Sequence, residues 1–518
     1  MSRLDRLIAL GAALLLLGAM PQGTINPVRI ESGLISGATD KRGVTAYLGI
    51  PFASPPVGQL RWRPPQAAGH WEGVREADHF GASCMQNEPG LRLPWTEEFM
   101  TQGAISEDCL FVNVWTAARS ASEKRAVMVF IYGGGFNEGS SSVAVYNGAE
   151  LARKDVVVVT LNYRVGPLGF LVLPELTKES EHQSSGDYGL LDQIAALGWV
   201  HRNIGAFGGA PGRVTIFGQS AGAISVADLM RSPLAKGLFA RAIAESGPGL
   251  FPESVLGGGM TLAQREQQGL RYAESKGAHS LADLRALPAA DFFKSTPGSK
   301  GGPPGVGGPV TDGWVLTAEH PAQEVPTIVG MVSGDAAFAS GFGPPVAPSV
   351  ASYTSLAQRT YGDRAATFLK LYPVEKDGDV AAARRASQTD RARVSIDVWC
   401  QDQVKRSGRV YTYFFDRPIP WPAHPEFGAF HSSEIPYIFE TIKLLERPWE
   451  PVDFRLSQMM ASYWSNFAKA GDPNAPGLTR WPIYEPDSHK TMELGERVGP
   501  MPEADPAKVE FFVRYFKK

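Results

Sequence analysis

The chain has 518 residues, of which 43% are hydrophobic, with 50 basic and 53 acidic residues and a formal net charge of -3. A chain of this length and composition can bury a large core. The near-neutral balance gives no electrostatic reason to expect a nucleic acid partner, and no block of like charge forms an interaction tail.

The N-terminal residues, "MSRLDRLIALGAALLLLGAM", have the pattern of a secretory signal peptide. Arg3 and Arg6 precede an apolar run that is too short to span a bilayer comfortably, and no later segment is long and apolar enough for a membrane helix. The run is apolar all round, which favours a signal over a buried amphipathic helix. We therefore expect residues 1–23 to be a signal peptide, with the cleavage site left open, and the mature protein to be periplasmic or secreted.

Short strands and turns are expected over residues 26–63, and longer elements follow. The runs at 125–132 and 155–164 are apolar and β-branched, as in strands covered on both faces. Further elements are predicted as helices at 188–204, 220–230 and within 250–287, and as strands at 213–218, 326–334 and 408–416. This alternation predicts an α/β fold with a mostly parallel sheet, in one catalytic domain over residues 24–518. The Gly/Pro-rich stretch at 297–309 is interpreted as a loop rather than a domain linker.

The chain contains three cysteines, Cys84, Cys109 and Cys400. Export makes a disulfide permissible, and Cys84 and Cys109 flank one loop-like stretch. Closing that loop would stabilise the fold by roughly 3 kcal/mol in the chain-entropy model. Cys400 is then expected to be a buried free thiol.

The stretch "FGQSAGA" at residues 217–223 joins a predicted strand to a predicted helix. Gly218, Ser220 and Gly222 fit the G-x-S-x-G spacing of a nucleophile elbow, in which a serine occupies a tight, strained turn. The neighbours must be small to avoid clashes with the adjacent strand and helix, and the turn exposes the serine Oγ at the carboxyl end of the strand. The alternative is a glycine-rich turn with an incidental serine. The strand–turn–helix context favours Ser220 as a catalytic nucleophile.

Several segments together resemble the type-B carboxylesterase/lipase family, an α/β-hydrolase family that includes the cholinesterases. "FGGAPGRVTIFGQSAG" (Phe207–Gly222) looks like the serine signature of that family, and "EDCLFVNVW" (Glu107–Trp115) matches its second signature. The resemblance extends over almost the entire mature chain, through "YLGIPFASPPVGQLRWRPP", "NYRVGPLGFL", "GDYGLLDQIAALGWV" and "WSNFAKAGDPN". It implies an α/β-hydrolase fold, with a central, mostly parallel twisted sheet flanked by helices. It is far less specific for the substrate.

A serine nucleophile needs a pocket for the oxyanion that forms when it attacks a carbonyl. The segment "IYGGGF" places three glycines after a predicted strand, and only glycine lets backbone N–H groups approach a substrate oxygen this closely. The resemblance implies that the N–H groups of Gly134, Gly135 and Ala221 form this oxyanion hole. Tyr132, which precedes the glycines, is interpreted as support for the loop.

The catalytic base should be a histidine that follows the nucleophile in the chain. Five histidines do so: His279, His320, His424, His431 and His489. Spacing alone does not separate His424 from His431. The resemblance does, because "AFHSSEIPYIF" matches the histidine segment of the family. His431 is therefore the predicted base, on a loop, and the three residues after it are expected to cap the following helix.

The third catalytic group should be a carboxylate that holds the imidazole tautomer. Most members of the family use glutamate in a segment similar to "GMVSGDAAF", where this chain has Asp335. Aspartate is chemically adequate but one methylene shorter, so the backbone must compensate. Asp312, in a turn-like "TDGW", and Glu324 are the competing candidates.

Other positions are interpreted as support for the site. Gln219 stands where many relatives carry glutamate, and its neutral side chain weakens the case for a cationic substrate. Trp95 is expected to pack in the core or at the rim of the site. Ser246 is expected to form hydrogen bonds behind the catalytic groups. Scaffold ion pairs are implied by the resemblance for Arg61 with Glu107 and for Arg164 with Asp192.

Together these features predict a serine carboxylesterase that hydrolyses small-molecule carboxylic esters through an acyl-enzyme, with Ser220, His431 and Asp335 as its triad. The sequence has no H-E-x-x-H, paired C-x-x-C, P-loop or convincing G-x-G-x-x-G, so no metal or cofactor is expected. One alternative is a lipase, or an esterase for bulky polyester natural products such as fumonisin-like toxins. Another is a non-catalytic, cholinesterase-like binding module. The sequence leaves the oligomeric state open.

Overall fold

A computed structural model of the chain describes residues 25–87, 90–250, 260–294, 307–318, 323–340 and 349–517. The predicted signal peptide and most of the predicted Gly/Pro-rich loop lie outside these residues. No helix within the described ranges combines the length and apolar character that a bilayer crossing needs.

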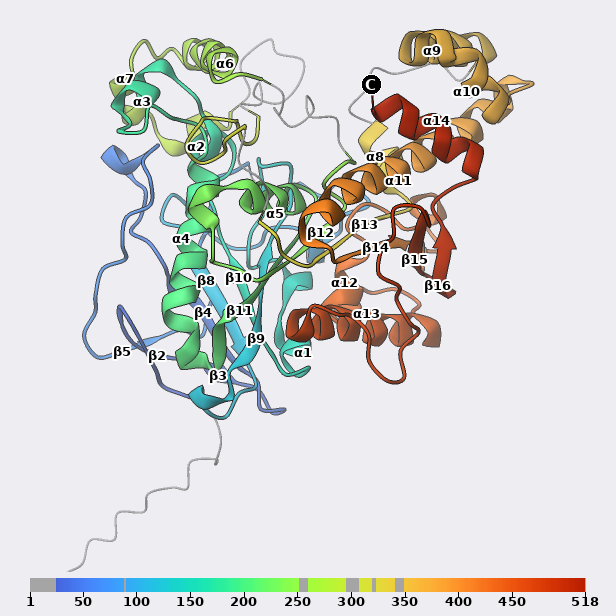
Figure 1. The fold of residues 1–518 in the computed structure, drawn as a ribbon. Helices are drawn as coiled ribbons and strands as arrows, with labels where there is room; N and C mark the ends of the chain where they lie inside the picture. The colour runs from blue at the N-terminus through green and yellow to red at the C-terminus, as the bar shows by residue number, and fades with distance from the viewer. Residues whose placement is uncertain are drawn as a thin grey trace, which may run out of the picture.

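A large twisted sheet runs through the molecule (Figure 1). Its strands from β15 through to β10 pair in parallel with their neighbours, and antiparallel strands complete both edges. This confirms the predicted α/β-hydrolase fold. In spatial order the strands are β16 (Val498–Pro502), β15 (Lys490–Leu494), β14 (Val410–Phe415), β13 (Thr327–Val332), β12 (Arg241–Glu245), β11 (Gly209–Gln219), β9 (Arg125–Ile131), β10 (Val156–Leu161), β8 (Phe111–Thr116), β4 (Thr45–Pro51) and β3 (Ala38–Thr39).

Helices cover the sheet on both sides (Figure 1). The helices α4 (Tyr188–Asn203) and α5 (Ala221–Arg231) pack on β11, while α1 (Ala149–Ala152) and α13 (Pro451–Ala470) pack on β10 from the other side. The predicted helices at 188–204 and 220–230 are thus present. The helical segment within 250–287 forms α6 (Leu262–Ser275) and α7 (Leu281–Ala286).

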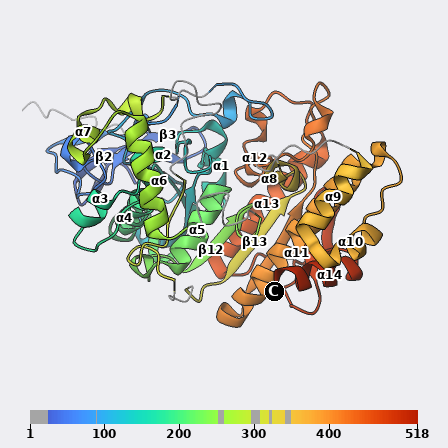
Figure 2. The ribbon, with the colours of Figure 1, turned by 90° about the horizontal axis from the view of Figure 1, so that it is seen from above.

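A second group of helices lies beyond β13 and β14, where Figure 2 shows it along one end of the molecule. It contains α9 (Val350–Tyr361), α10 (Ala365–Leu371), α11 (Val380–Ser407) and α14 (Pro506–Phe516). These helices enclose their own aromatic cluster, in which Tyr361 packs on Phe368, Phe511 and Phe512. The short helix α8 (Asp335–Ser340) contacts α11 and so joins this group to the end of β13.

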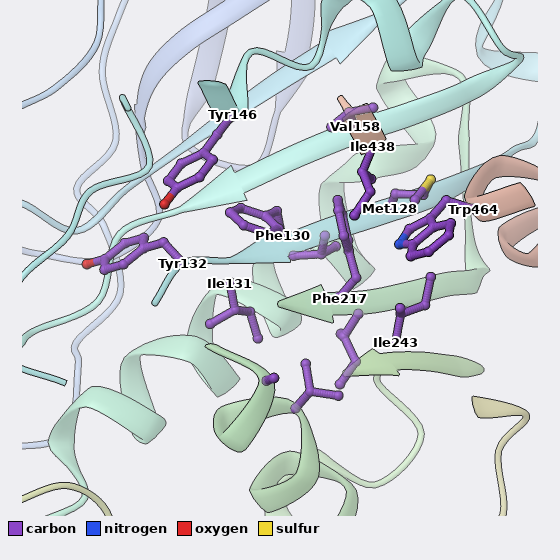
Figure 3. Close-up of a cluster of buried hydrophobic side chains, with 14 of the residues drawn as sticks. Met128, Phe130, Ile131, Tyr132, Tyr146, Val158, Phe217, Ile243, Ile438 and Trp464 are labelled. Atoms are coloured by element: carbon purple, nitrogen blue, oxygen red, sulfur yellow. The ribbon is translucent and has the colours of Figure 1, made fainter. Parts of the chain in front are cut away.

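The main core lies around the central strands, because these strands are buried on both faces. Every residue of β10 is buried, as its run of β-branched residues predicts. Phe130 of β9 contacts Tyr146 and Phe217, with ring centroids 4.7 and 4.9 Å away (Figure 3). It also contacts Phe439, with centroids 5.1 Å apart. This packing fixes β9 and β11 against each other, and the segments that follow both strands build the site.

Candidate active site

Ser220 occupies the turn between β11 and α5, as predicted. Its φ of 58° and ψ of -123° lie where residues other than glycine are rarely found, so the turn is strained. A Cβ atom added to Gly222 would lie 2.0 Å from the carbonyl oxygen of Ile131, and one on Gly218 would lie 2.6 Å from the same oxygen. Both positions must therefore be glycine for α5 to pack this closely on β9. The motif requires glycine at these two positions because backbone atoms occupy the space that side chains would fill.

The predicted oxyanion residues lie beside Ser220. Gly134 and Gly135 follow β9 with φ angles of 105° and 61°, and both line the same cavity as Ser220. Ala221 is the first residue of α5, where a backbone N–H has no acceptor within the helix. Tyr132 supports the loop, because its hydroxyl donates to the Tyr163 carbonyl at 2.9 Å and the Tyr163 hydroxyl donates back to the Tyr132 carbonyl at 2.9 Å.

The structure brings His431 and Asp335 together, although 96 residues separate them in sequence. The His431 Nδ1 lies 2.5 Å from the Asp335 Oδ1, and both side chains are almost fully buried. The other carboxylate oxygen, Oδ2, accepts a hydrogen bond of 2.9 Å from the Val332 N–H. Because a carboxylate only accepts, this pairing places the imidazole proton on Nδ1 and leaves Nε2 as the basic nitrogen.

A direct backbone contact explains how an aspartate reaches the histidine. The Gly334 N–H donates to the Ala429 carbonyl at 2.9 Å, so the turn before α8 touches the loop that carries His431. A Cβ atom on Gly334 would lie 2.4 Å from that oxygen, which excludes any side chain there. The close approach of the two loops is the compensation that the shorter carboxylate requires.

The competing candidates lie elsewhere. Asp312 organises its own turn, because its Oδ1 accepts hydrogen bonds from the N–H groups of Trp314, Val315 and Leu316. Glu324 is exposed at the surface. His424 contacts the exposed Glu426 and does not line the cavity that contains Ser220. None of these three is placed to act with Ser220.

A cavity of about 450 Å³ contains the predicted nucleophile, the oxyanion glycines and the base. The loop between Cys84 and Cys109 supplies one wall, and Phe338 of α8 supplies another. Asn137, Glu138 and Tyr146, which sequence reasoning missed, line it too. None of the described residues between 250 and 309 lines this cavity.

Gln219 lies against the predicted base. Its amide nitrogen is 3.3 Å from the His431 Nε2 and 3.5 Å from Nδ1. Because the amide nitrogen is almost equally far from both ring nitrogens, Gln219 packs against the ring and does not form one strong, directed hydrogen bond. A neutral amide therefore touches the imidazole where a glutamate would place a charge.

Two buried glutamates lie behind the site. Burial raises the pKa of Glu245 from 4.5 to about 8, and its Oε1 accepts a 2.7 Å hydrogen bond from the Trp464 indole. Burial, followed by the charge of Asp335, raises the pKa of Glu434 well above its usual range. Ser246 donates to Glu434 at 3.4 Å, as its expected supporting role implies. Burial therefore favours the neutral form of both glutamates.

One local prediction is wrong. The residues after His431 do not cap the next helix, α12 (Ile435–Ile438), whose N-terminus receives no side-chain hydrogen bond. Instead the Ser432 hydroxyl donates to the His431 carbonyl and accepts a hydrogen bond of 3.0 Å from the Trp95 indole. Ser432 therefore links the predicted base to the loop that carries Trp95. No local sequence pattern predicts this contact.

The predicted scaffold contacts are present. Cys84 and Cys109 form a disulfide, and Cys400 is a buried free thiol. Two pairs of oppositely charged side chains hold the segments around the site in bidentate contact: Arg61 with Glu107 at 2.5 and 2.7 Å, and Arg164 with Asp192 at 2.7 and 2.7 Å.

Comparison with known proteins gives one consistent family. The profile of the Carboxylesterase family matches residues 25–511. The chain is 36% identical over 486 residues to the fumonisin B1 esterase of Sphingopyxis macrogoltabida, covering 90% of this chain and 86% of that protein. It is 34% identical over 496 residues to the para-nitrobenzyl esterase of Bacillus subtilis, covering 91% and 95%. A solved structure of a PNB esterase superposes with a TM-score of 0.77 at 31% identity, covering 94% of this chain and 99% of that one.

The matched residues 25–511 include the central strands and the segments that line the cavity. The chain therefore belongs to the carboxylesterase family and is a carboxylic ester hydrolase with an α/β-hydrolase fold.

Proposed function

We propose that the protein hydrolyses carboxylic esters through an acyl-enzyme on Ser220, with His431 as general base and acid and Asp335 as the group that orients it. The hydrogen bond between His431 and Asp335 supports this assignment most directly. His431 lines the same cavity as the strained serine, and this hydrogen bond joins it to a buried carboxylate behind the cavity wall. The oxyanion N–H groups are those of Gly134, Gly135 and Ala221.

The proposed reaction has two halves. In the first, the His431 Nε2 takes the proton of Ser220 as Oγ bonds to the ester carbonyl carbon, and the carbonyl oxygen becomes negative at the three N–H groups. The same proton then passes to the leaving alcohol as the ester C–O bond breaks. In the second half, His431 takes a proton from water as the water attacks the acyl-enzyme, and returns it to the Ser220 Oγ as the acid leaves.

Replacement of the nucleophile tests this proposal. The parent should hydrolyse p-nitrophenyl acetate, and Ser220→Ala should lower kcat by at least about a thousandfold while the thermal midpoint stays close to that of the parent. Ser122→Ala, on an exposed turn, provides the matched control and should keep full activity. An inactive parent, or a Ser220→Ala protein with parental activity, would contradict the proposal.

We propose bulky polyesters as a second candidate substrate class within the same chemistry. The match to a fumonisin B1 esterase at 36% identity favours it. Neutral Gln219 beside the base gives no attraction for a cationic ester. Rates on short-chain esters, long-chain emulsions and bulky polyesters, compared at equal enzyme concentration, separate a carboxylesterase, a lipase and a polyester esterase.

We also propose that the protein acts outside the cytoplasm, with residues 1–23 removed on export. The pattern of those residues and the disulfide between Cys84 and Cys109 support this, because structural disulfides persist in oxidising compartments. The intact mass of the protein recovered from the periplasm or medium tests it. A mass that retains the first 23 residues would contradict the proposal.

A further inference from the structure

The imidazole of His431 has a further contact besides those with Asp335 and Gln219. The ring of Phe338 stacks on it face to face, with centroids 4.1 Å apart and an angle of 11° between the planes. The hydrogen bond to Asp335 fixes the Nδ1 edge of the imidazole. Rotation about the Cβ–Cγ bond would swing the ring out of its plane, and that motion meets the phenyl face. The two contacts together therefore restrain both the edge and the tilt of the base.

Phe338 is held in turn by Trp95, from the loop that the disulfide closes. The two rings meet edge to face, with centroids 5.7 Å apart and an angle of 77°. The indole N–H of Trp95 also donates to the Ser432 hydroxyl at 3.0 Å, and Ser432 donates to the His431 carbonyl. Trp95 thus contacts both Phe338, which stacks on the imidazole, and Ser432, which follows His431 in the chain. The guanidinium of Arg92 lies 5.3 Å over the indole and pairs with Glu138, which fixes the far side of Trp95.

We propose that Phe338 and Trp95 are positioning residues for the catalytic base, and we call them the aromatic bracket. This inference rests on the proposed role of His431. The bracket holds the Nε2 in one place while it takes a proton from Ser220, passes it to the leaving alcohol, and repeats the transfer with water. Geometry matters in these steps, because a misplacement of about 1 Å can cost on the order of a hundredfold in rate.

Both bracket residues also line the cavity, so a purely steric role in substrate binding is the competing explanation. The two roles differ in the kinetic parameter that they affect. Loss of a wall that only contacts substrate changes KM, whereas loss of a group that positions the base lowers kcat. The two roles also differ in the enzyme without substrate. Replacement of a bracket residue alters the environment of the imidazole there only if that residue positions the base.

The test compares Phe338→Leu, which keeps an apolar side chain but removes the flat ring, with Phe338→Tyr, which keeps the ring. With p-nitrophenyl acetate, Phe338→Leu should lower kcat by about tenfold or more and change KM by less than about threefold. Phe338→Tyr should restore most of the rate. Trp95→Phe, which keeps an aromatic ring but loses the N–H to Ser432, should lie between them. Leu91→Ala, on the same loop but largely exposed, is the control and should match the parent.

A proton NMR measurement on the free enzyme completes the test. The Nδ1–H that His431 shares with Asp335 should give a low-field resonance, identified by its loss in His431→Gln. It should broaden or vanish through exchange with water in Phe338→Leu and persist in Phe338→Tyr. Parental kcat together with an unchanged resonance in Phe338→Leu would overturn the inference, as would an effect confined to KM. An inactive parent would instead remove the proposed ester hydrolysis, while the resonance would still report on the bracket.

Discussion

The two halves of the proposed catalytic site, one around the proposed nucleophile and one around the proposed base, are built by different means. Ser220, Gly134 and Gly135 lie at the ends of adjacent strands, where backbone packing and glycine set the geometry. His431 is instead held by side chains from two distant segments: Asp335 and Phe338 of α8 contact the imidazole, and Trp95 of the 84–109 loop contacts Phe338. The nucleophile half therefore depends on space around the main chain, whereas the base half depends on contacts that a single side-chain replacement can remove without unfolding the protein.

The largest effect is expected from breaking the base half at Asp335. Asp335→Asn keeps the size of the side chain but no longer enforces the Nδ1–H tautomer, and kcat should fall by about 10³–10⁴-fold. Stability should change little by comparison, as thermal unfolding would show. The matched control is Glu324→Gln, which removes an exposed carboxylate in the same region of the chain and should keep parental activity. A fall of less than about tenfold in Asp335→Asn would remove this residue from the triad.

Breaking the nucleophile half should instead damage the fold. In Gly222→Ala the new methyl group meets the Ile131 carbonyl, so the elbow must open, and the free energy of unfolding should drop by about 3 kcal/mol or more. Gly212→Ala provides the control, because Gly212 lies in β11, the strand that leads into the elbow, and has nothing within 4 Å of the added atom. Urea unfolding of both variants measures the difference. If Gly222→Ala were as stable as Gly212→Ala, the packing account of the motif would fail.

The smallest effect is expected in the pH dependence of stability, through Glu245 behind the nucleophile. The carbonyl of Glu245 accepts the Ser220 N–H, and burial raises the pKa of its carboxyl from 4.5 to about 8. Between these values the folded state binds more protons than the unfolded state, so the contribution of Glu245 to stability is lost as the pH rises towards 8. Glu245→Gln keeps an acceptor for Trp464 and removes this titration.

As the pH rises from about 5 to about 9, the parent should lose free energy of unfolding relative to the Glu245→Gln variant, because only the parent has this titration. Urea unfolding at both pH values measures this relative change. Glu485→Gln, at an exposed position, should show none. An equal difference from the parent at both pH values would show that Glu245 does not titrate in this range.

The difference between the halves also explains what the sequence could predict. The alternation of strands and helices, the elbow and the glycines after β9 are local patterns, so their positions follow from short stretches of sequence. Asp335 and His431 could be chosen only by family resemblance, because spacing does not state which distant loops meet. Their contact depends on Gly334 touching Ala429, and the stacking of Phe338 on His431 depends on that same approach. No periodicity or propensity encodes such a meeting of loops.

The serine-capping error has the same origin. Serines before a helix are usually caps, but Ser432 faces Trp95 from a loop more than 300 residues earlier in the chain and bonds to it instead. Long-range packing overrode a sound local preference. The cavity wall shows this as well, since Asn137, Glu138 and Tyr146 carry no recognisable motif and enter the site only because of where β9 ends.

Covalent labelling tests directly whether the Ser220 hydroxyl is activated by the His431 imidazole. A fluorophosphonate reacts with an activated serine, and mass spectrometry of the digested protein locates the adduct. We expect one label per chain, on Ser220, and no label on His431→Gln under the same conditions. A label on another serine, or equal labelling of Ser220 in His431→Gln, would contradict this expectation.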